Sequence, residues 1–433
     1  WTKLDEHIVS AAVNDKHDFK FGSWNPYLKF GAYGEYRTRK YTTRDLIYNW
    51  NAADNTLPDG FRQMDIPTLL SNQEYFGADR LYLLEEPHMR NNYKGNNYMG
   101  AGYIAAMLPF GKLNIYAGLR YEYDHMELIS NTRDYEESPF SHNYEYNDIF
   151  PSINTTYKFN DKHQLRLSYG KTVNRPEFRE MSPSVFYDFD LASSVQGNTD
   201  LKPCYIQNVD LRYEFYPSKG EVISIAAFYK YFDSPIEWTY IVTGGTNLLY
   251  SYKNAQLANN YGIELDIRKN LGFIGLKDFS WSFNGALIKS KVKFEKGARE
   301  ENRPMQGQSP YLVNTGIFYN NDKMQLDIAV LYNRIGKRII GVGRSEGTTS
   351  GNEALRVPDS YEMPRDVIDL SASKRFGKHW EVKINVRDLL AQKVYYKQFA
   401  NVHYEDGRHK EVEQITRAFK PGRNFGLTAT YKF

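Results

Sequence analysis

The end of the chain alternates between two classes of side chain. Phe425, Leu427, Ala429, Tyr431 and Phe433 occupy every second position, while Asn, Gly, Thr and Lys fill the positions between them. A period of two predicts a β-strand with one apolar and one wet face. We interpret this strand, which stops on a terminal Phe, as the closing strand of a barrel in an outer membrane.

The same alternation recurs through most of the chain. Each run is close to the about 9–11 residues that a tilted strand needs to cross lipid. No helical periodicity of similar strength is present. Apolar residues recur at every second position in segments 113–123, 165–169, 209–215, 261–267, 313–319, 324–330 and 380–386.

The connections between these runs alternate in length. Turn-forming residues lie at 109–111, 160–163, 217–220, 320–322 and 376–378. Long polar connections lie near 44–96, 131–147, 177–203, 295–309, 341–363 and 401–420. Short turns on one rim and long loops on the other are typical of outer-membrane barrels, which have short periplasmic turns and long extracellular loops. The sequence therefore predicts an all-β, antiparallel transmembrane barrel.

Composition and hydropathy agree with this fold without deciding it. The chain has 36 Tyr, 25 Phe and 6 Trp, and a mean hydropathy of −0.64. No apolar run reaches the about 18 residues of a transmembrane helix. The charge balance, 55 Lys+Arg against 52 Asp+Glu, gives no electrostatic case for binding nucleic acid. Cys204 is the only cysteine, which excludes an intrachain disulfide.

Several short motifs recur along the chain in a definite order and spacing. They are GLRYE at 118–122, FPSIN at 150–154, LRLSY at 165–169, NRP at 174–176, GNTDLKP at 197–203, GQSP at 307–310 and NVRDLL at 385–390. Each motif is weak alone, but the set, which spans roughly residues 97–433, resembles TonB-dependent outer-membrane receptors and in particular their Bacteroidetes members.

The resemblance implies a barrel of about 22 strands around a plugged lumen. Counting gives about fifteen strands here, the first of them within residues 1–20. Single-chain barrels have even strand numbers, because both termini lie in the periplasm. We therefore expect residues 1–433 to be the C-terminal portion of a receptor barrel, with the N-terminal plug domain and the first strands absent. A link to the TonB system would run through that plug.

Charged residues at alternate strand positions are candidates for the lumen wall. We expect them to face the lumen and the plug, either as a cradle for the plug or as solvated charges that pair across neighbouring strands. The candidates are Arg120, Glu122, Asp210, Arg212, Glu214, Glu264, Asp266 and Arg268.

Aromatic residues in two long connections are candidates for ligand contact. Exposed rings in loops give rigid contact area, although they can equally pack on each other or join the aromatic girdle of the membrane interface. The candidates are Tyr48, Trp50, Phe61, Tyr75, Phe76 and Tyr82 in the first connection, and Phe186, Tyr187 and Phe189 in the other.

The sequence gives no basis for an enzyme, a resident cofactor or a metal site. His403 and His409 lie near acidic residues, but their spacing matches no strong ligand pattern. We expect a receptor in a Gram-negative outer membrane that binds a scarce nutrient (a siderophore, haem, cobalamin, a glycan or a peptide) at its extracellular loops for TonB-driven uptake.

Two alternatives remain open at this point. The first is a non-transporting barrel that serves as a structural or assembly partner in a surface complex. The second is a soluble all-β binding module such as a lectin. The expected partners of the receptor are outer-membrane lipid, the TonB system and, as a candidate, a surface lipoprotein, with no nucleic acid.

Overall fold

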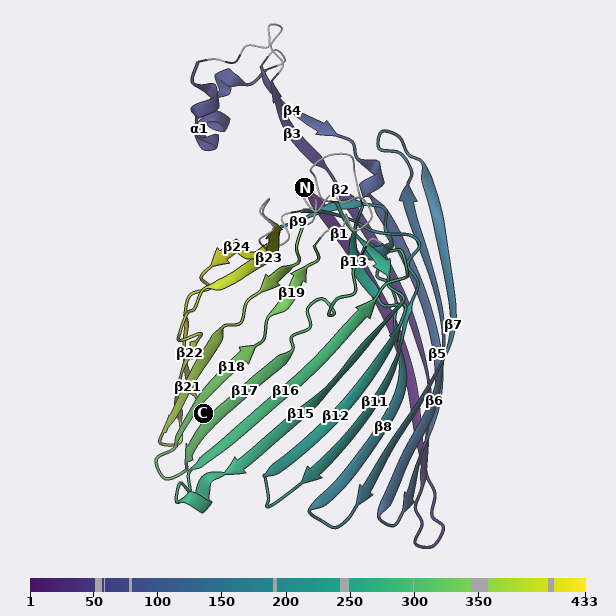
Figure 1. Ribbon diagram of the computed structural model, residues 1–433, viewed down its shortest axis with the longest axis vertical. Helices are drawn as coiled ribbons and strands as arrows, with labels where there is room; N and C mark the ends of the chain where they lie inside the picture. Colours follow the sequence, from purple (N-terminus) through teal and green to yellow (C-terminus); the bar gives the residue numbers. More distant parts are fainter. Residues whose placement is uncertain are drawn as a thin grey trace.

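One large antiparallel sheet dominates the computed structural model, which describes residues 1–433 except 51–56, 58, 78–79, 190–192, 242–248, 299, 344–356 and 404–408. The sheet has 15 strands, and each of them pairs with its neighbour along the chain within that sheet. Figure 1 shows that it curves into the wall of an open barrel. The predicted count of about fifteen strands is confirmed.

The strands of the wall run in the order of the sequence. They are β1 (Thr2–Asp18), β2 (Tyr27–Thr43), β5 (Tyr93–Phe110), β6 (Leu113–Asn131), β7 (Pro139–Lys158), β8 (His163–Asn174), β11 (Cys204–Phe215), β12 (Val222–Asp233), β15 (Leu257–Asn270), β16 (Phe279–Lys293), β17 (Tyr311–Asn321), β18 (Leu326–Ile335), β21 (Asp366–Phe376), β22 (Trp380–Arg387) and β25 (Asn424–Tyr431). β1 and β25 form the two edges of the sheet.

The short turns gather at one end of the wall and the long connections at the other (Figure 1). The predicted turns at 109–111, 160–163, 217–220, 320–322 and 376–378 all lie at the short end. Gly111 and Gly220 adopt φ of 61° and 81° there, a backbone conformation that glycine enters without a Cβ clash. The expected asymmetry between two rims is therefore present.

The long connections carry secondary structure of their own. β9 (Val185–Asp188), β10 (Ser193–Gln196), β13 (Ile236–Ile241) and β14 (Leu249–Asn254) form one small sheet, while β19 (Arg338–Gly341), β20 (Ser360–Glu362), β23 (Val394–His403) and β24 (His409–Phe419) form another. β3 (Asp45–Trp50) and β4 (Leu81–Glu86) make a hairpin that leads to helix α1 (Ile66–Ser71). Four-residue helix α2 spans Phe178–Met181. Short 3-10 turns η1 (Phe61–Gln63), η2 (Gln73–Tyr75), η3 (Met89–Asn91) and η4 (Leu271–Ile274) complete the set.

Two expectations about the connections were wrong. The predicted long connection at 131–147 is mostly strand, because β7 begins at Pro139 and pairs with β6 up to Asn131. Phe140, Tyr144 and Tyr146 do occupy alternate positions there, but the segment has none of the aliphatic residues that mark the other strands. The connection that holds β13 and β14 was not expected at all, although Ile236 and Trp238 alternate with polar residues.

The two faces of the wall differ as the alternation predicts. Leu119, Leu211 and Ile263 are large apolar side chains that remain about half exposed on one face. On the opposite face, residues paired directly across the strands from β8 to β18 form a continuous polar row. Its members are Gln164, Glu214, Ser224, Asp266, Asn284, Asn314 and Asn333.

Strands β5, β6 and β7 are 18, 19 and 20 residues long. They exceed the about 9–11 residues needed to cross lipid, so they extend well beyond the membrane. Their upper ends form a tall wall in Figure 1, and the largest buried core of the described residues packs against it. This core, and not the middle of the sheet, positions the candidate site.

Candidate functional site at the mouth of the barrel

The main apolar core lies at the mouth of the barrel, where connections fold against the wall. Phe178 and Met181 of helix α2 are buried, as is Leu128 on β6. We call this group the mouth core. Its buried members are Tyr93, Met126, Leu128, Phe178, Met181, Val195, Leu201, Tyr250, Tyr252, Ile339 and Val342.

Two glycines make room for helix α2. A Cβ on Gly95 of β5 would lie 2.4 Å from Cδ1 of Phe178, so the ring packs where a side chain would otherwise stand. A Cβ on Gly197 would lie 2.1 Å from the carbonyl oxygen of Ser182. Helix α2 therefore lies between strand β5 and the residue that follows strand β10. Both close contacts are possible because glycine has no side chain.

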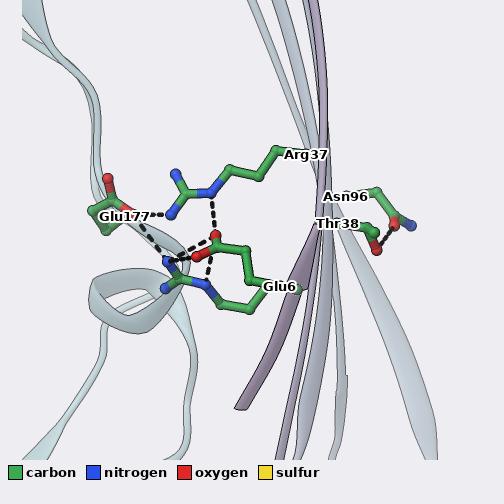
Figure 2. A network of polar contacts seen from close by, with 6 residues as sticks. Glu6, Arg37, Thr38, Asn96 and Glu177 are labelled. Atoms are coloured by element: carbon green, nitrogen blue, oxygen red, sulfur yellow. Dashed lines mark hydrogen bonds and ion pairs between the residues drawn. The ribbon is translucent and has the colours of Figure 1, made fainter. Parts of the chain in front are cut away.

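A cluster of charged side chains lies on the wall side of Phe178. Figure 2 shows Glu6, Arg37 and Glu177 of this cluster. Arg37 and Arg39 lie two positions apart on β2, and their guanidinium carbons are 5.3 Å and 5.6 Å from the centroid of the Phe178 ring. Cations at this distance from a ring face are attracted to it. Both guanidinium groups also bind the Glu6 carboxylate of β1.

Glu177 joins this cluster from the loop side. Arg37 donates a hydrogen bond from Nη2 to Oε2 of Glu177 at 3.0 Å, and Arg39 Nη2 lies 3.9 Å from the same oxygen. Thr38 and Asn96 point to the opposite face of the wall, where Thr38 Oγ1 lies 2.9 Å from Asn96 Oδ1 (Figure 2). The alternation of β2 therefore directs the two arginines inward.

A second ion cluster ties the start of the same connection to the wall. Arg175 donates to Glu122 at 2.8 Å and to Asp148 at 2.8 Å, and Tyr205 donates to Asp148 at 2.7 Å. The side chains of Arg175, Glu122 and Asp148 are largely buried. Removal of one partner from a buried set of this kind leaves an unpaired charge in a low-dielectric site.

The predicted wall charges divide into two groups. Arg120 pairs with Glu122 at 2.6 Å, and Arg212 lies 3.4 Å from Glu214 and 3.6 Å from Asp266. Asp210, Glu264 and Arg268 form no ion pair with any other residue that the structure describes. Cross-strand pairing thus accounts for some of these charges, and their contact with a plug stays a prediction.

A hollow of about 410 Å³ lies on the inner face of the wall. Asp266, Arg268, Asn284, Asn314 and Asp369 are among its lining residues. Part of the polar row described above therefore borders open space, and this face can hold water.

The predicted aromatic candidates fall into two groups. In the first connection they pack on each other. Trp50 and Phe61 lie 5.1 Å apart, Phe61 and Tyr75 lie 5.6 Å apart, and Tyr48 and Phe76 lie 6.1 Å apart between ring centroids. Tyr82 accepts a hydrogen bond from Asn49. This hairpin, β3–β4 with helix α1, projects beyond the barrel (Figure 1).

The second group lies at the edge of the mouth core. Phe186 packs against the core, and the guanidinium carbon of Arg179 is 3.4 Å from its ring centroid. Tyr187 and Phe189 remain 52% and 84% exposed and form an edge-to-face pair at 5.0 Å. Of the second group, these two rings have the exposure that ligand contact requires. Their role as ligand contacts stays a prediction.

Sequence reasoning missed several residues of the mouth. Arg37, Arg39, Glu177 and Phe178 were not singled out, because nothing in a period of two marks which inward residues a distant loop will reach. Trp238, Tyr250 and Tyr252 were missed with the connection that carries them. Their aromatic content was the available signal.

Burial dominates the ionisation of the loop residues in this region. It raises the pKa of Glu180 and raises the pKa of Tyr252 to about 12. Burial also raises the pKa of Glu237, although Arg303 lies 2.9 Å away and opposes the shift. Neutral forms of these groups are therefore favoured more than in water.

The described part of the chain has neither a cluster of metal-binding side chains nor a membrane-spanning helix. No cluster of three or more His, Cys, Asp or Glu that could hold a metal ion occurs among these residues. The side chains of His403 and His409 lie outside the described residues. None of the described helices is long and apolar enough to span a membrane.

The sequence matches the model of the outer membrane protein beta-barrel family over residues 35–425. The chain belongs to this family. Its location is therefore the bacterial outer membrane, as predicted, and the curved sheet is a barrel wall whose half-exposed apolar face meets lipid. No curated protein sequence matches the chain.

Solved structures with a similar fold are import receptors. They include the ferric-catecholate import receptor Fiu from E. coli K12, with 14% sequence identity and a TM-score of 0.63. The match covers 100% of this chain and 55% of that receptor. The ferric yersiniabactin uptake receptor FyuA from Yersinia pestis gives 15% identity, a TM-score of 0.59, and 100% and 55% coverage. The siderophore receptor PiuA from Acinetobacter baumannii has 11% sequence identity and a TM-score of 0.61, and the match covers 100% of this chain and 56% of that receptor.

At these identities the similarity establishes the fold. The predicted resemblance to a receptor barrel is confirmed at that level, and the fold matches that of outer-membrane transport receptors, which are not enzymes. This family member spans about half the length of the solved structures that it matches.

Proposed function

We propose that this barrel belongs to an outer-membrane receptor that binds a scarce nutrient at its mouth and takes it up by TonB-driven transport. The observation that carries the proposal is the combination of a polar inner face with a mouth where loops pack inward. The polar row from Gln164 to Asn333 gives a wet passage. The mouth core holds the loops of the extracellular end in a fixed arrangement above it.

We further propose that residues 1–433 form the C-terminal portion of a larger barrel of about 22 strands around a plug. The 15-stranded sheet with separate edges at β1 and β25 supports this proposal. Coverage of 55% of the length of Fiu and of FyuA points the same way. On this view Asp210, Glu264 and Arg268, the inward charges that form no ion pair with a described residue, face the plug.

A ferric siderophore is the first cargo to test. Fiu and FyuA carry the descriptions of ferric-catecholate import and ferric yersiniabactin uptake. Haem, cobalamin, a glycan and a peptide complete the candidate set. The exposed ring pair of Tyr187 and Phe189 offers contact area that suits a planar or aromatic ligand.

The test is uptake by cells that contain the complete receptor in their outer membrane. We expect deletion of its gene to abolish accumulation of one labelled nutrient of the set. A protonophore should abolish accumulation while surface binding persists, because TonB-driven uptake needs inner-membrane energy. Unchanged uptake of every class in the deletion strain, with the receptor present in the parent membrane, would contradict the transport proposal.

A second candidate function is a partner role in a surface complex, with a surface lipoprotein as the partner. It is favoured by one observation, the exposed apolar side chains of the β3–β4 hairpin. Leu46, Tyr48 and Leu83 lie on one face of this two-stranded ribbon and are 44%, 50% and 54% exposed. An isolated two-stranded ribbon is marginally stable in water, so a covering partner would stabilise it.

This candidate is tested by the size of the receptor complex extracted from its native membrane in mild detergent. Replacement of Leu46 and Leu83 by Asp should reduce the mass by one partner and leave the barrel folded. If the extracted complex has the mass of the receptor alone, both in the wild type and after the two substitutions, a stable partner at the hairpin is excluded.

A further inference from the structure

Two arginines of the wall lie at the mouth with one displaceable carboxylate beside them. The side chains of Arg37 and Arg39 are 22% and 13% exposed, and they lie two positions apart on the same face of β2. Among the described residues, the carboxylates in contact with them are those of Glu6 and Glu177. These two contacts differ in strength and in accessibility.

Glu6 is a fixed part of the wall. It pairs with both arginines, and Arg39 binds its two oxygens from Nε and Nη2 at 3.1 Å and 3.2 Å. Such a forked arrangement is the strong geometry for a guanidinium and a carboxylate. The Glu6 side chain is 23% exposed. An incoming anion therefore does not replace Glu6, since both of its oxygens are already held by Arg39.

Glu177 is held more weakly. One hydrogen bond of 3.0 Å joins it to Arg37, its distance to Arg39 is 3.9 Å, and its side chain is 54% exposed. Ion pairs with this exposure contribute little, because water screens them and competes for the same donors. A dissolved anion can therefore compete with Glu177 for Arg37.

The surroundings favour an anion. A third guanidinium, that of Arg179, contacts the Phe186 ring and forms no ion pair with a described residue. Tyr93 lies within electrostatic range of both Arg39 and Arg179. Three arginines thus gather around Phe178 and Tyr93, with the carboxylates of Glu6 and Glu177 as the acidic groups that bind Arg37 and Arg39.

We propose that Arg37 and Arg39 bind an oxyanion group, a carboxylate or a phosphate, of a solute that enters the mouth, and that Glu177 occupies this site as an internal competitor. Displacement of Glu177 separates the N-cap of helix α2 from the wall. Phe178 then loses the paired guanidinium groups that hold its ring, and the connection 175–203 loosens. The proposal deepens the proposed function, on which it rests, by giving the cargo a negative charge.

The test uses the complete receptor purified from outer membranes in detergent. Citrate and inorganic phosphate serve as the carboxylate and phosphate probes, with sodium chloride at equal ionic strength as the reference. Titration calorimetry measures binding. Amide hydrogen exchange measures opening at Glu180, Met181 and Ser182, whose N–H groups donate to Glu177 and Phe178 carbonyls.

In the wild-type receptor, saturating probe should raise the exchange rate of these amides several-fold. Glu177→Gln should bind the same probe up to about fivefold more tightly, since an exposed ion pair of up to about 1 kcal/mol no longer competes. Its amides should exchange fast without any probe. Arg37→Gln should lose probe binding. Binding of citrate alone or of phosphate alone identifies the oxyanion class.

Glu136→Gln is the matched control. It breaks the ion pair of Arg133 and Glu136 on the neighbouring connection, which is also exposed, and should bind like the wild type. Heat-modifiable migration in gels checks that each variant has a folded barrel. If Arg37→Gln does not fold, the Glu177→Gln titration decides alone.

Equal affinity of wild type and Glu177→Gln would overturn the proposal, as would wild-type exchange rates that no probe changes. Neither readout requires transport. A receptor that does not take up any nutrient can still bind the oxyanion probe. A transporter of neutral cargo would take up its nutrient but would not bind the probe.

Discussion

Phe178 fills the space above Gly95 where any other residue would place a side chain. The two residues come from a loop helix and from the wall strand β5, and a Cβ on Gly95 would lie 2.4 Å from Phe178 Cδ1. The loop and the wall therefore fit together only with glycine at this position. This contact anchors the connection 175–203 at the mouth of the barrel.

Gly95→Ala should release this anchor. The added methyl group forces the Phe178 ring out of the mouth core, and large losses of buried aromatic contact cost about 3–5 kcal/mol. We expect limited proteolysis to cut the connection 175–203 at least tenfold faster, while the barrel keeps its heat-modifiable migration. Gly100→Ala on the same strand is the control, since a Cβ there meets open space. Equal cleavage of both variants would refute the anchor.

Arg175→Gln should weaken the same connection by a different route. The change leaves Glu122 and Asp148 buried without their shared cation. Breaking a buried ion pair in this way costs about 3–5 kcal/mol. Thermal unfolding followed by circular dichroism should show a lower midpoint. The exposed Arg133→Gln should change the stability by no more than about 0.5 kcal/mol, and a comparable loss in both variants would argue against burial as the cause.

The local stability of the β13–β14 hairpin should depend on pH through Glu237. Burial raises the pKa of this carboxyl above its ordinary value of 4.5 in the folded protein. A raised folded-state pKa stabilises the fold fully below the unfolded pKa, and this contribution disappears as pH rises through the folded pKa. Hairpin amides, corrected for intrinsic exchange rates, should therefore open more readily as the pH rises above the ordinary carboxyl value of 4.5.

Glu237→Gln isolates that contribution. Glu300 in the same region has a lowered pKa, where burial opposes the shift but hydrogen bonding to Thr239 and the charge of Lys253 outweigh it. Its contribution has the opposite sign and is lost as pH falls. The difference between wild type and Glu237→Gln removes this background. A difference that does not vary with pH would contradict a raised pKa at Glu237.

Adjacent residues of β15 should respond in opposite ways to a lysine. Ile263 lies on the half-exposed apolar face, and Glu264 lies on the polar face beside it. A lysine on the lipid face costs up to about 2–4 kcal/mol near the middle of the membrane, while lumen positions tolerate charge. We expect Ile263→Lys to reduce assembly and denaturant resistance and Glu264→Lys to leave both close to wild type. A larger defect in Glu264→Lys would reverse the assignment of faces.

The sequence predicted the wall well, since a barrel strand must alternate to satisfy lipid on one side and water on the other. Leu119 and Arg120 could be assigned to opposite faces from their positions alone. The alternation of short turns and long connections predicted the two rims of the barrel, because successive strands cross the membrane in opposite directions. The prediction for segment 131–147 was wrong because this part of β7 alternates rings with polar residues and lacks the aliphatic residues that a lipid-facing strand carries.

The mouth could be predicted only in part. The ring pair of Tyr187 and Phe189 was found from its aromatic content in a long connection, and Glu122 from its place on the wall. The rings around Trp50 were found too, but the structure shows them packed on one another. Nothing local distinguishes a ring that will pack from a ring that will stay exposed.

Local alternation by itself determined the strands, their faces and the rims of this outer-membrane barrel, because the period of the backbone forces these on any strand that crosses lipid. Tertiary structure alone brought Arg37 to Glu177 across 140 residues of chain and set Phe178 above Gly95. Those contacts depend on strand register and on the path of a loop back to the wall. Neither the register nor the path of the loop leaves a periodic pattern in the sequence, so only the tertiary structure shows the contacts of the mouth.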